Sequence, residues 1–287
     1  MVGEVGGGKT TIAKTMLRGR PDAQGKVKCG KVILDGVDLL SLSEAAMRKV
    51  RGGQVTMVFQ DPMTALNPIM KVGEQIAEVI RKHQTREDKT AREMAEDMLA
   101  MVGIPRERYG EYPHQFSGGM KQRVVIAMAL ACNPHLLLAD EPTTALDVTI
   151  QAQVLDMMDD LKKKYNTAMI LITHDLGVVG RMCDNVAVIY AGEVLEYGSK
   201  EEIFLHPQHP YTIGLFGAIP DLSVDTRRLA NIEGLPPDPT DLPTGCCFNP
   251  RCPHATEKCR TIKFPLTEVR PGHFCSCPYC EAAEKED

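Results

Sequence analysis

The sequence predicts an α/β protein with a mostly parallel sheet and a small, irregular C-terminal appendage. Short runs rich in β-branched residues alternate with longer stretches of helical periodicity over the first two thirds of the chain, an order typical of parallel sheets whose strands are joined by helices. With 287 residues, 43% of them hydrophobic, the chain can bury a substantial core in one domain and still supply an appendage.

The expected strands are short apolar runs, and the expected helices are longer segments with apolar residues three and four apart. The predicted strands are Lys31 to Leu34, Val55 to Phe59, Leu136 to Ala139, Ala168 to Thr173, Val186 to Tyr190 and Glu193 to Tyr197. The predicted helices are Lys89 to Val102, with Ala91, Met94, Ala95, Met98 and Leu99 on one face, Ser117 to Ala131, and Thr149 to Tyr165.

The composition excludes several classes of protein. A formal net charge of -5 and a pI near 5.9 argue against a nucleic-acid partner, because phosphate backbones are bound by basic surfaces. The longest apolar runs, such as Val124 to Cys132, are much shorter than the ~20 residues of a membrane-spanning helix. No secretory signal opens the sequence, and we expect the chain to stay in the cytoplasm.

The cysteines divide into two groups. Of the ten, Cys29, Cys132 and Cys183 are scattered and are expected to be small apolar side chains, whereas the other seven crowd between Cys246 and Cys280. In a reducing compartment such a cluster indicates a metal site more often than a disulfide framework. Prolines become frequent after His206 and predict a linker into this cysteine-rich unit; they are Pro207, Pro210, Pro220, Pro236, Pro237, Pro239 and Pro243.

A phosphate-binding loop is predicted close to the start of the sequence. The segment Gly3-Glu4-Val5-Gly6-Gly7-Gly8-Lys9-Thr10, followed by Thr11, fits the P-loop pattern. In that pattern glycines allow backbone N–H groups to surround phosphates, the lysine neutralises their charge and the hydroxyl binds Mg²⁺. The residues expected to bind nucleotide are Gly3, Gly6, Gly7, Gly8, Lys9, Thr10 and Thr11, with Thr10 on the metal.

Two acidic residues end a predicted apolar strand farther along the chain. The run Leu136-Leu137-Leu138-Ala139 leads into Asp140 and Glu141. After a P-loop, this arrangement predicts that Asp140 holds Mg²⁺ and that Glu141 orients or deprotonates the attacking water.

Between these motifs lies Phe116-Ser117-Gly118-Gly119-Met120-Lys121-Gln122-Arg123, which resembles the signature sequence of ABC ATPases. A Ser-Gly-Gly that opens a helix offers free N–H groups and a positive dipole end to a phosphate. The resemblance implies that Ser117, Gly118 and Gly119 contact ATP held by another subunit, so that two such domains enclose two nucleotides.

Further segments are similar to this family in the same order. Gln60 resembles the glutamine that contacts Mg²⁺ or the attacking water, Ala145-Leu146-Asp147 resembles the loop that crosses the dimer interface, and His174 resembles the histidine that contacts the γ-phosphate. By resemblance the catalytic residues are therefore Glu141, His174 and Gln60, and the Mg²⁺ ligands are Thr10, Gln60 and Asp140.

One branch of the family is the most similar. Gln60-Asp61-Pro62-Met63-Thr64-Ala65-Leu66-Asn67-Pro68 and His209-Pro210-Tyr211-Thr212 resemble ATP-binding subunits of oligopeptide, dipeptide and nickel importers. The resemblance implies an ABC nucleotide-binding domain at residues 1–205, with a helical subdomain at about 61–131, and an oligopeptide-transporter-type extension at 206–287. It implies ATP and Mg²⁺ as cofactors and ATP hydrolysis coupled to peptide import.

The same resemblance implies partners and a location. The partners are a second ABC ATPase subunit, in a homodimer or heterodimer, two transmembrane permease subunits and, indirectly, an extracytoplasmic substrate-binding protein. The expected location is the cytoplasmic face of the cell membrane, as a peripheral subunit.

The cysteine-rich tail is the most distinctive part of the resemblance. In relatives with this tail, four cysteines can hold an iron-sulfur cluster, and the resemblance implies Cys246, Cys252, Cys259 and Cys277 as the matching positions. Thiolate ligands suit a [4Fe-4S] cluster or a structural Zn²⁺, and spacing does not choose between them. Cys247, Cys275 and Cys280 add further thiols, and a tail of unligated thiols is the alternative.

The start of the sequence departs from the family. Only Met1 and Val2 precede Gly3, where relatives have a strand and an aromatic residue that stacks on adenine. A P-loop normally follows such a strand, so the sequence predicts an N-terminally truncated chain. The alternatives to a peptide-importer ATPase are a nickel or other small-solute importer ATPase of the same family, a soluble ABC ATPase acting on DNA or ribosomes, and a truncated, non-hydrolysing interaction subunit.

Overall fold

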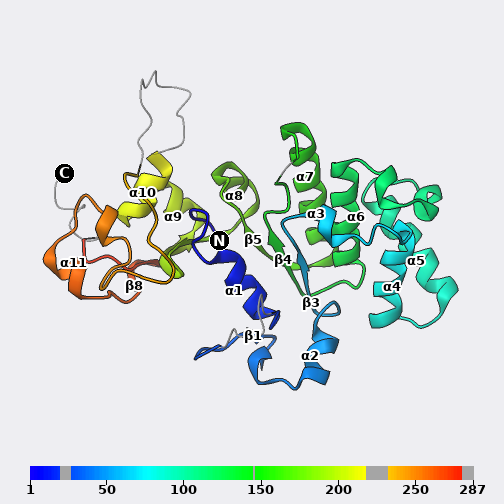
Figure 1. Ribbon diagram of the computed structural model, residues 1–287, viewed down its shortest axis with the longest axis horizontal. Helices are drawn as coiled ribbons and strands as arrows, with labels where there is room; N and C mark the ends of the chain where they lie inside the picture. Colours follow the sequence, from blue (N-terminus) through cyan, green and yellow to red (C-terminus); the bar gives the residue numbers. More distant parts are fainter. Residues whose placement is uncertain (20–26, 145, 218–231, 280–287) are drawn as a thin grey trace. The chain divides into compact units, whose positions relative to one another are not determined.

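The computed structural model describes residues 1–19, 27–144, 146–217 and 232–279 of the chain (Figure 1). The chain divides into two compact units. One unit comprises Met1–Thr10 and Thr173–Asp287, and the other comprises Thr11–Ile172.

A parallel three-stranded sheet forms the centre of the unit from Thr11 to Ile172. Its strands are β3 (Val55–Val58), β4 (Leu136–Asp140) and β5 (Ala168–Ile172), in the order β3-β4-β5. Val55 pairs with Leu136, and Leu136 with Ala168. Val55, Val58, Leu138 and Ala139 are fully buried, as expected for a sheet covered on both faces. The prediction of a parallel sheet is confirmed.

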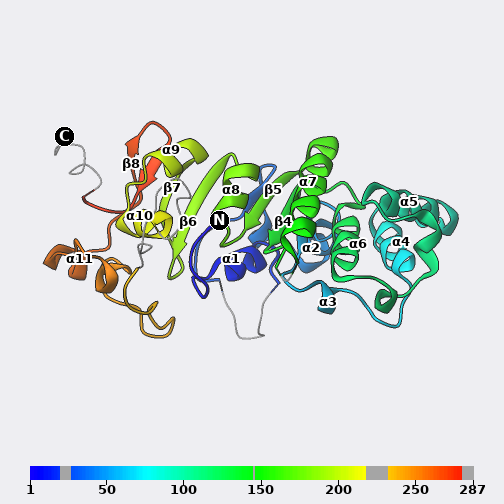
Figure 2. The ribbon, with the colours of Figure 1, turned by 90° about the horizontal axis from the view of Figure 1, so that it is seen from above.

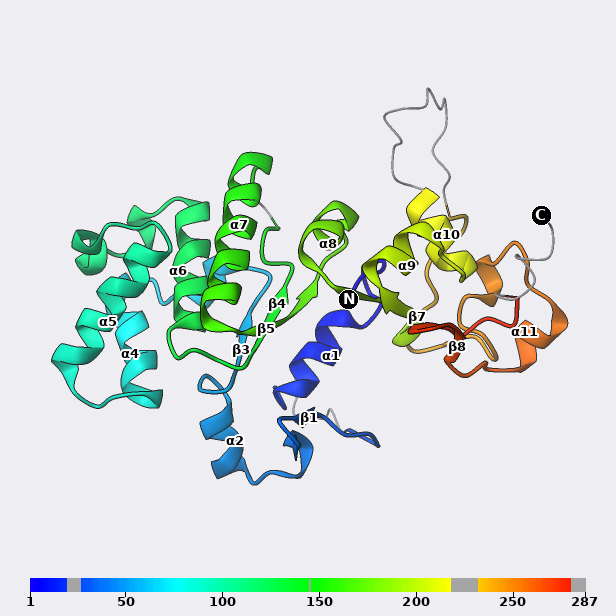
Figure 3. The same ribbon diagram turned by 180° about the vertical axis from the view of Figure 1, so that it is seen from behind.

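Several helices belong to the same unit as this sheet. Figure 3 shows α4 and α5 side by side, next to α6. The long helices are α4 (Val72–His83), α5 (Asp88–Met101), α6 (Gly118–Leu130) and α7 (Val148–Tyr165). The predicted apolar face of α5 is buried at Ala91, Ala95, Met98 and Leu99. Three of these helices were predicted to within one residue at each end, whereas α4 was not predicted.

Short elements complete this unit. They are β1 (Ile33–Leu34), β2 (Val37–Asp38), α2 (Glu44–Val50), α3 (Pro62–Ala65) and the 3₁₀ helices η1 (Leu39–Ser41), η2 (Arg106–Gly110) and η3 (Pro113–Gln115). The expected strand from Lys31 to Leu34 is only the two-residue β1, which pairs antiparallel with β2. Asp35 and Gly36 turn the chain between them with positive φ angles of 48° and 80°, so the segment is a tight hairpin.

The second unit has an antiparallel sheet in the order β6-β7-β9-β8. Its strands are β6 (Asn185–Tyr190), β7 (Glu193–Ser199), β8 (Thr267–Arg270) and β9 (His273–Cys275). Its helices are α8 (Leu176–Met182), α9 (Lys200–Leu205), α10 (Pro210–Gly217), α11 (Glu257–Thr261) and the 3₁₀ helix η4 (Asn249–Arg251). Figure 2 shows α9 and α10 beside β6 and β7. Because β9 pairs with β7, the C-terminal segment contributes strands that were not predicted.

Aromatic residues from distant parts of the chain form the core of this unit. Tyr211 and Phe248 are 0% and 1% exposed, and the Phe248 ring lies 5.3 Å from the rings of both Tyr190 and Tyr211. Aromatic pairs at this spacing stabilise beyond the area they bury. The cysteine-rich segment around Phe248 is therefore part of the core.

Buried polar groups connect β7 to β9 and to the start of α10. Glu196 and His273 are 0% exposed and lie 2.7 Å apart between Oε1 and Nε2. Glu196 Oε2 accepts the backbone N–H of His209 at 2.9 Å, and His209 Nδ1 accepts the N–H of Tyr211 at 3.0 Å. Burial lowers the pKa of His209 to about 4, since a protonated imidazole would lose its hydration.

In the described part of the chain, no helix is long and apolar enough to span a membrane.

We predict that His209 makes the stability of this unit depend on pH. The unfolded chain takes up the proton near pH 6.5, whereas folded His209 does so only near pH 4, so stability is lost as pH falls from 6.5 toward 4. The difference between these two pKa values lowers the free energy of unfolding by about 3 kcal/mol at pH 4. His209→Asn keeps an acceptor for the Tyr211 N–H and should flatten the profile of thermal unfolding midpoint against pH. His206→Asn, at an exposed position, is the control, and equal profiles for the two variants would contradict the prediction.

Candidate functional site

The loop from Gly3 to Gly8 leads directly into α1 (Lys9–Met16). Val2 precedes it and pairs with β6: the Val2 N–H donates to Ala187 O at 2.9 Å, and the Ile189 N–H donates to Val2 O at 2.7 Å. Gly3, Gly6 and Gly8 have φ angles of 150°, 83° and 88°, which favour glycine. A Cβ on Gly3 would lie 2.0 Å from Ile189 O, so glycine is required there for packing as well.

The Lys9 side chain is buried against this loop and binds its backbone. Its side chain is 5% exposed, and Nζ donates to the carbonyl oxygens of Gly3 and Glu4, both at 2.7 Å. The Gly7 N–H also donates to Glu4 O, at 3.3 Å. Thr10 and Thr11 follow in the first turn of α1, half-buried and exposed respectively. A buried ammonium beside a glycine loop and a helix N-terminus suits a polyphosphate.

The carboxyl edge of the parallel sheet brings two predicted site residues together. Gln60 Nε2 donates to Glu141 Oε2 at 3.0 Å, although the two residues are 81 positions apart. Gln60 follows β3 and Glu141 follows β4, and parallel strands end at the same edge. Glu141 has a φ of 46°, and its N–H donates to Ile172 O at 2.9 Å, so the carboxylate is held at the point where the strand ends. Asp140, the last residue of β4, is 2% exposed.

Thr144 is a member of this group that the sequence analysis missed. Its Oγ1 donates to Glu141 Oε2 at 2.9 Å, and its N–H donates to Glu141 O at 3.2 Å. The signal available in the sequence was the spacing, because a hydroxyl three residues after an acid faces it across a turn.

The predicted signature segment opens a helix at the surface. Ser117 is the N-cap of α6, and its side-chain oxygen accepts the Met120 N–H at 3.4 Å. Ser117 and Gly118 are exposed, and a Cβ on Gly118 would meet no atom within 4 Å. Gly119 is more restricted, because a Cβ there would lie 2.5 Å from Ile150 Cγ2.

His174 immediately precedes the N-cap of α8, and the expected interface loop ends at the N-cap of α7. His174 is exposed, and the neighbouring Asp175 accepts the N–H groups of Gly177 and Val178. Asp147 caps α7 by accepting the Ile150 N–H at 2.9 Å, whereas Ala145 lies outside the described residues. The predicted site residues thus fall into two groups. Gly3 to Thr10 and His174 belong to one compact unit, and Thr11, Gln60, Ser117 to Gly119, Asp140 and Glu141 belong to the other.

The tail cysteines predicted as metal ligands are free thiols, whereas Cys275, expected to be a further thiol, is disulfide-bonded. The pKa of the Cys277 thiol is raised to about 11, first by burial and then by the thiols of Cys252, Cys246 and Cys259. Burial also raises the pKa values of Cys246 and Cys252. Within residues 1–19, 27–144, 146–217 and 232–279, however, no three or more His, Cys, Asp or Glu side chains are arranged to hold a metal ion.

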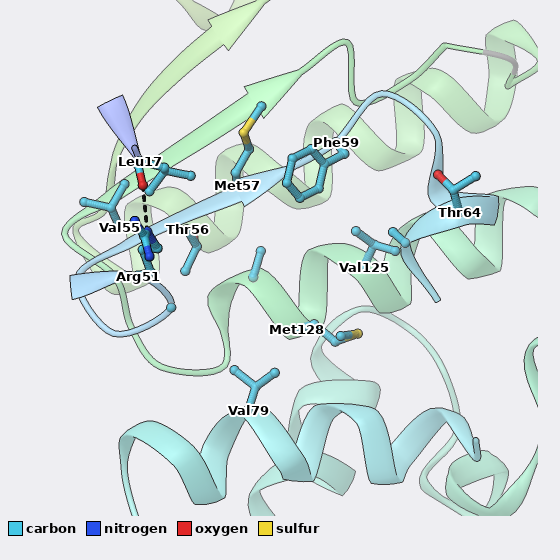
Figure 4. A pocket seen from close by; sticks show the side chains of 13 residues that line it. Leu17, Arg51, Val55, Thr56, Met57, Phe59, Thr64, Val79, Val125 and Met128 are labelled. Carbon is cyan, nitrogen blue, oxygen red and sulfur yellow. Dashed lines mark hydrogen bonds between the residues drawn. The ribbon is translucent and has the colours of Figure 1, made fainter. Parts of the chain in front are cut away.

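An apolar cavity of about 550 Å³ is lined in part by Phe59 (Figure 4), the residue that precedes Gln60 in the sequence. Residues from β3 and from α6 face it, with Val79 of α4 on the far side. Its other lining residues include Leu17, Arg51, Met57, Thr64, Val125 and Met128.

Two family models match the sequence. The model described as ABC transporter matches residues 1–144, and the model described as oligopeptide/dipeptide transporter, C-terminal region, matches residues 195–259. The chain is 50% identical over 279 residues to the oligopeptide transport ATP-binding protein OppD of Haemophilus influenzae, covering 96% of this chain and 85% of that protein. It is 47% identical over 280 residues to the dipeptide transport ATP-binding protein DppD of Bacillus subtilis, covering 96% and 83%.

Solved structures of ATP-binding cassettes are also similar. The dimeric post-hydrolysis cassette MJ0796 bound to ADP and Pi matches with a TM-score of 0.60 and 28% identity, over 69% of this chain and 83% of that chain. CbiO1 from Clostridium perfringens, part of the ABC transporter complex cbiONQ, matches with a TM-score of 0.61 and 26% identity, over 71% and 78%.

We predict that Gly3→Ala damages the loop far more than Gly6→Ala. Both glycines have positive φ, which costs an L-residue about 1–2 kcal/mol, but only at Gly3 would the new methyl group meet a backbone oxygen. Gly3→Ala should therefore lower the thermal unfolding midpoint and prevent nucleotide binding, whereas Gly6→Ala should show the smaller conformational cost alone. Similar unfolding midpoints and nucleotide affinities for the two variants would show that the close approach to Ile189 O does not matter.

Proposed function

Because the chain belongs to the ABC transporter family, with the C-terminal region of its oligopeptide and dipeptide transporters, we propose specific roles for its residues in ATP-driven peptide import. The chain is an ATPase subunit of such an importer, and ATP and Mg²⁺ are its cofactors. The observation that carries the proposed site is the loop of positive-φ glycines closed by buried Lys9.

Phosphate binding is assigned to the loop and the start of α1. Backbone N–H groups of Gly6 and Gly8 donate to the phosphates. The Gly7 N–H, which donates to Glu4 O, and the Lys9 ammonium, which donates to Gly3 O and Glu4 O, exchange these carbonyl partners for β- and γ-phosphate oxygens. Gly3 sets the close approach of the loop to β6, and Thr11 continues the N–H surface in the first helical turn. The Thr10 hydroxyl would bind the metal.

Hydrolysis is assigned to the edge of the parallel sheet. The Glu141 carboxylate orients the attacking water and accepts its proton as the water oxygen bonds to the γ-phosphorus and the bond to the ADP oxygen breaks. Gln60 and Thr144 hold that carboxylate by hydrogen bonds. Thr10, Asp140 and Gln60 are the proposed ligands that would hold Mg²⁺, which would neutralise phosphate charge when bound. His174 donates a hydrogen bond to the γ-phosphate.

A second ATPase subunit completes the proposed site. Ser117 and Gly118 are exposed at the N-terminus of α6, where they suit the γ-phosphate of ATP bound by the partner. A partner of the same sequence and a related one are both compatible with this surface, and family resemblance favours a heterodimer.

Permease subunits are the proposed occupants of the apolar cavity beside Phe59. Phe59 is 45% exposed and immediately precedes Gln60, so a permease helix seated there would be adjacent to a residue hydrogen-bonded to Glu141. The chain then acts at the cytoplasmic face of the membrane with two permease subunits, and an extracytoplasmic binding protein contacts it only through them. Nucleic acid has no role in this assembly.

The proposed role of the tail cysteines is to bind a [4Fe-4S] cluster or Zn²⁺ that stabilises the C-terminal segment. Supporting it, Cys246, Cys252 and Cys277 are half-buried, and neighbouring thiols add to the effect of burial in raising the pKa of each. Thiolates are the form that binds either metal, and binding would lower the raised pKa values.

We predict that Glu141→Gln separates ATP binding from hydrolysis. The amide keeps the side chain's shape but cannot accept a proton, so phosphate release by the assembled ATPase dimer should fall at least about 100-fold while MgATP still binds. Lys9→Ala should abolish binding itself. Glu107→Gln, at an exposed position outside the site, is the matched control. Phosphate release at the wild-type rate by Glu141→Gln would exclude Glu141 as the base.

We predict that chain purified without oxygen carries iron with acid-labile sulfide, or zinc, and that Cys252→Ser removes most of it. Cys29→Ser is the control, because Cys29 is an exposed thiol far from the tail in sequence. Elemental analysis and visible absorption distinguish the two metals. Absence of both metals from the wild-type chain would mean that the tail thiols are unligated.

A further inference from the structure

Glu4 is the residue of the phosphate-binding loop whose polar atoms are most fully engaged. Its N–H donates to Tyr211 Oη at 2.9 Å, and its carbonyl oxygen accepts from Lys9 Nζ at 2.7 Å and from the Gly7 N–H at 3.3 Å. Its carboxylate accepts two hydrogen bonds from Arg251, at 2.6 Å from Nη1 and 3.1 Å from Nη2. Tyr211 and Arg251 both come from the C-terminal part of the chain, so that part holds Glu4 at the backbone and at the side chain.

Arg251 binds the Glu4 carboxylate from a buried position and in a fixed orientation. Its side chain is only 6% exposed, against 28% for Glu4. Its remaining hydrogen bonds go to the Glu233 carbonyl at 3.0 Å from Nε, the Ile232 carbonyl at 3.3 Å from Nη2 and the Tyr190 hydroxyl at 3.3 Å from Nη1. A planar guanidinium bound at all three nitrogens has a fixed direction. The hydrogen bonds to Glu4 are the main reason that its pKa is raised further.

The turn that carries Arg251 is itself fixed by the core. Arg251 ends η4, and its N–H donates to Phe248 O at 3.0 Å. Phe248 is 1% exposed between the rings of Tyr190 and Tyr211. Cys246, Cys247 and Cys252 flank the same turn, so the cysteine-bearing segment sets the position of the guanidinium.

A carboxylate within a phosphate-binding loop has an electrostatic cost. ATP with Mg²⁺ remains anionic, and an uncompensated negative charge at Glu4 would repel it in a partly buried setting, where charges are weakly screened. The paired guanidinium cancels that charge and fixes the Glu4 carboxylate, and with it the stretch of loop backbone that precedes Lys9. The Glu4 carbonyl oxygen holds Lys9 Nζ inside the loop before nucleotide binds.

We propose that Arg251 is a positioning residue of the ATP site: by neutralising and fixing Glu4, it makes ATP affinity depend on the C-terminal cysteine-bearing turn. This inference rests on the proposed function, because it assumes that the loop from Gly3 to Thr10 binds ATP. Arg251 need not touch the nucleotide. Its effect on ATP passes through the charge and position of Glu4 to the loop backbone.

The test is a charge-pair cycle in the full chain. The variants are Arg251→Met, Arg251→Lys, Glu4→Gln and the double variant Glu4→Gln/Arg251→Met. Arg260→Met is the matched control, because Arg260 lies in the same C-terminal segment with 63% of its side chain exposed and a loose 3.5 Å ion pair to Glu257. Calorimetry gives the MgATP dissociation constant of each chain, steady-state phosphate release gives KM and kcat, and thermal unfolding reports folding.

Arg251→Met should weaken MgATP binding by about tenfold or more, because a unit negative charge is left unpaired beside the phosphates. The change should appear in KM, with kcat at saturating ATP nearly unchanged. The MgATP affinity of Arg251→Lys should lie between those of the wild type and Arg251→Met, since lysine keeps the positive charge but lacks the two-nitrogen fork of the guanidinium. The double variant removes both charges and should return to within about threefold of wild type. Because removing both charges would also relieve a folding defect, the unfolding midpoints must show that Arg251→Met is still folded where its affinity is measured.

Two other results have distinct meanings. If the wild-type chain and Arg260→Met both fail to bind MgATP, the proposed ATP site is wrong, and this inference is wrong with it. If they bind and Arg251→Met binds equally tightly, or the double variant is as weak as Arg251→Met, the ATP site stands and only the role of Arg251 is overturned.

Discussion

The site depends on one constraint: a loop that offers its N–H groups to phosphate must have its other polar atoms bound by the protein. Between Val2 and Lys9 this is achieved by the pairing of Val2 with β6, the Lys9 ammonium on two carbonyl oxygens, and the anchors on Glu4. Unpaired buried polar groups cost about 1–3 kcal/mol each, so these contacts keep the loop in a single shape. Several of them come from β6, α10 and the turn around Arg251, far along the sequence.

The same logic applies at the edge of the parallel sheet. β3, β4 and β5 are in register, so Gln60 and Glu141 leave neighbouring strands at the same level and form a hydrogen bond. Glu141 adopts a φ of 46°, uncommon for a residue with a side chain, and its N–H is fixed to Ile172 O. Strain of this kind persists only where the surroundings impose it. Here it directs the Glu141 carboxylate away from β4, whose side chains from Leu137 to Asp140 are buried.

Local patterns in the sequence predicted most of what is local in the structure. The glycine loop, the strands β3 to β7 and the helices α5, α6 and α7 were anticipated to within one or two residues, because periodicity and turn chemistry act over short distances. The addition of β9 to β7, the Glu196–His273 pair and the Arg251–Glu4 pair were missed. They join positions up to 247 residues apart, and one sequence contains no signal that pairs such partners.

ATP-driven peptide import by this ATPase is tested most directly by the uptake of a radiolabelled tripeptide into proteoliposomes. These would contain the chain, its partner ATPase and its permeases, with the binding protein on the opposite side of the membrane from the ATPases. We expect tripeptide to accumulate only when MgATP is present on the side of the ATPase subunits. Accumulation without nucleotide, or MgATP-dependent uptake of nickel ions but not of any peptide, would contradict it.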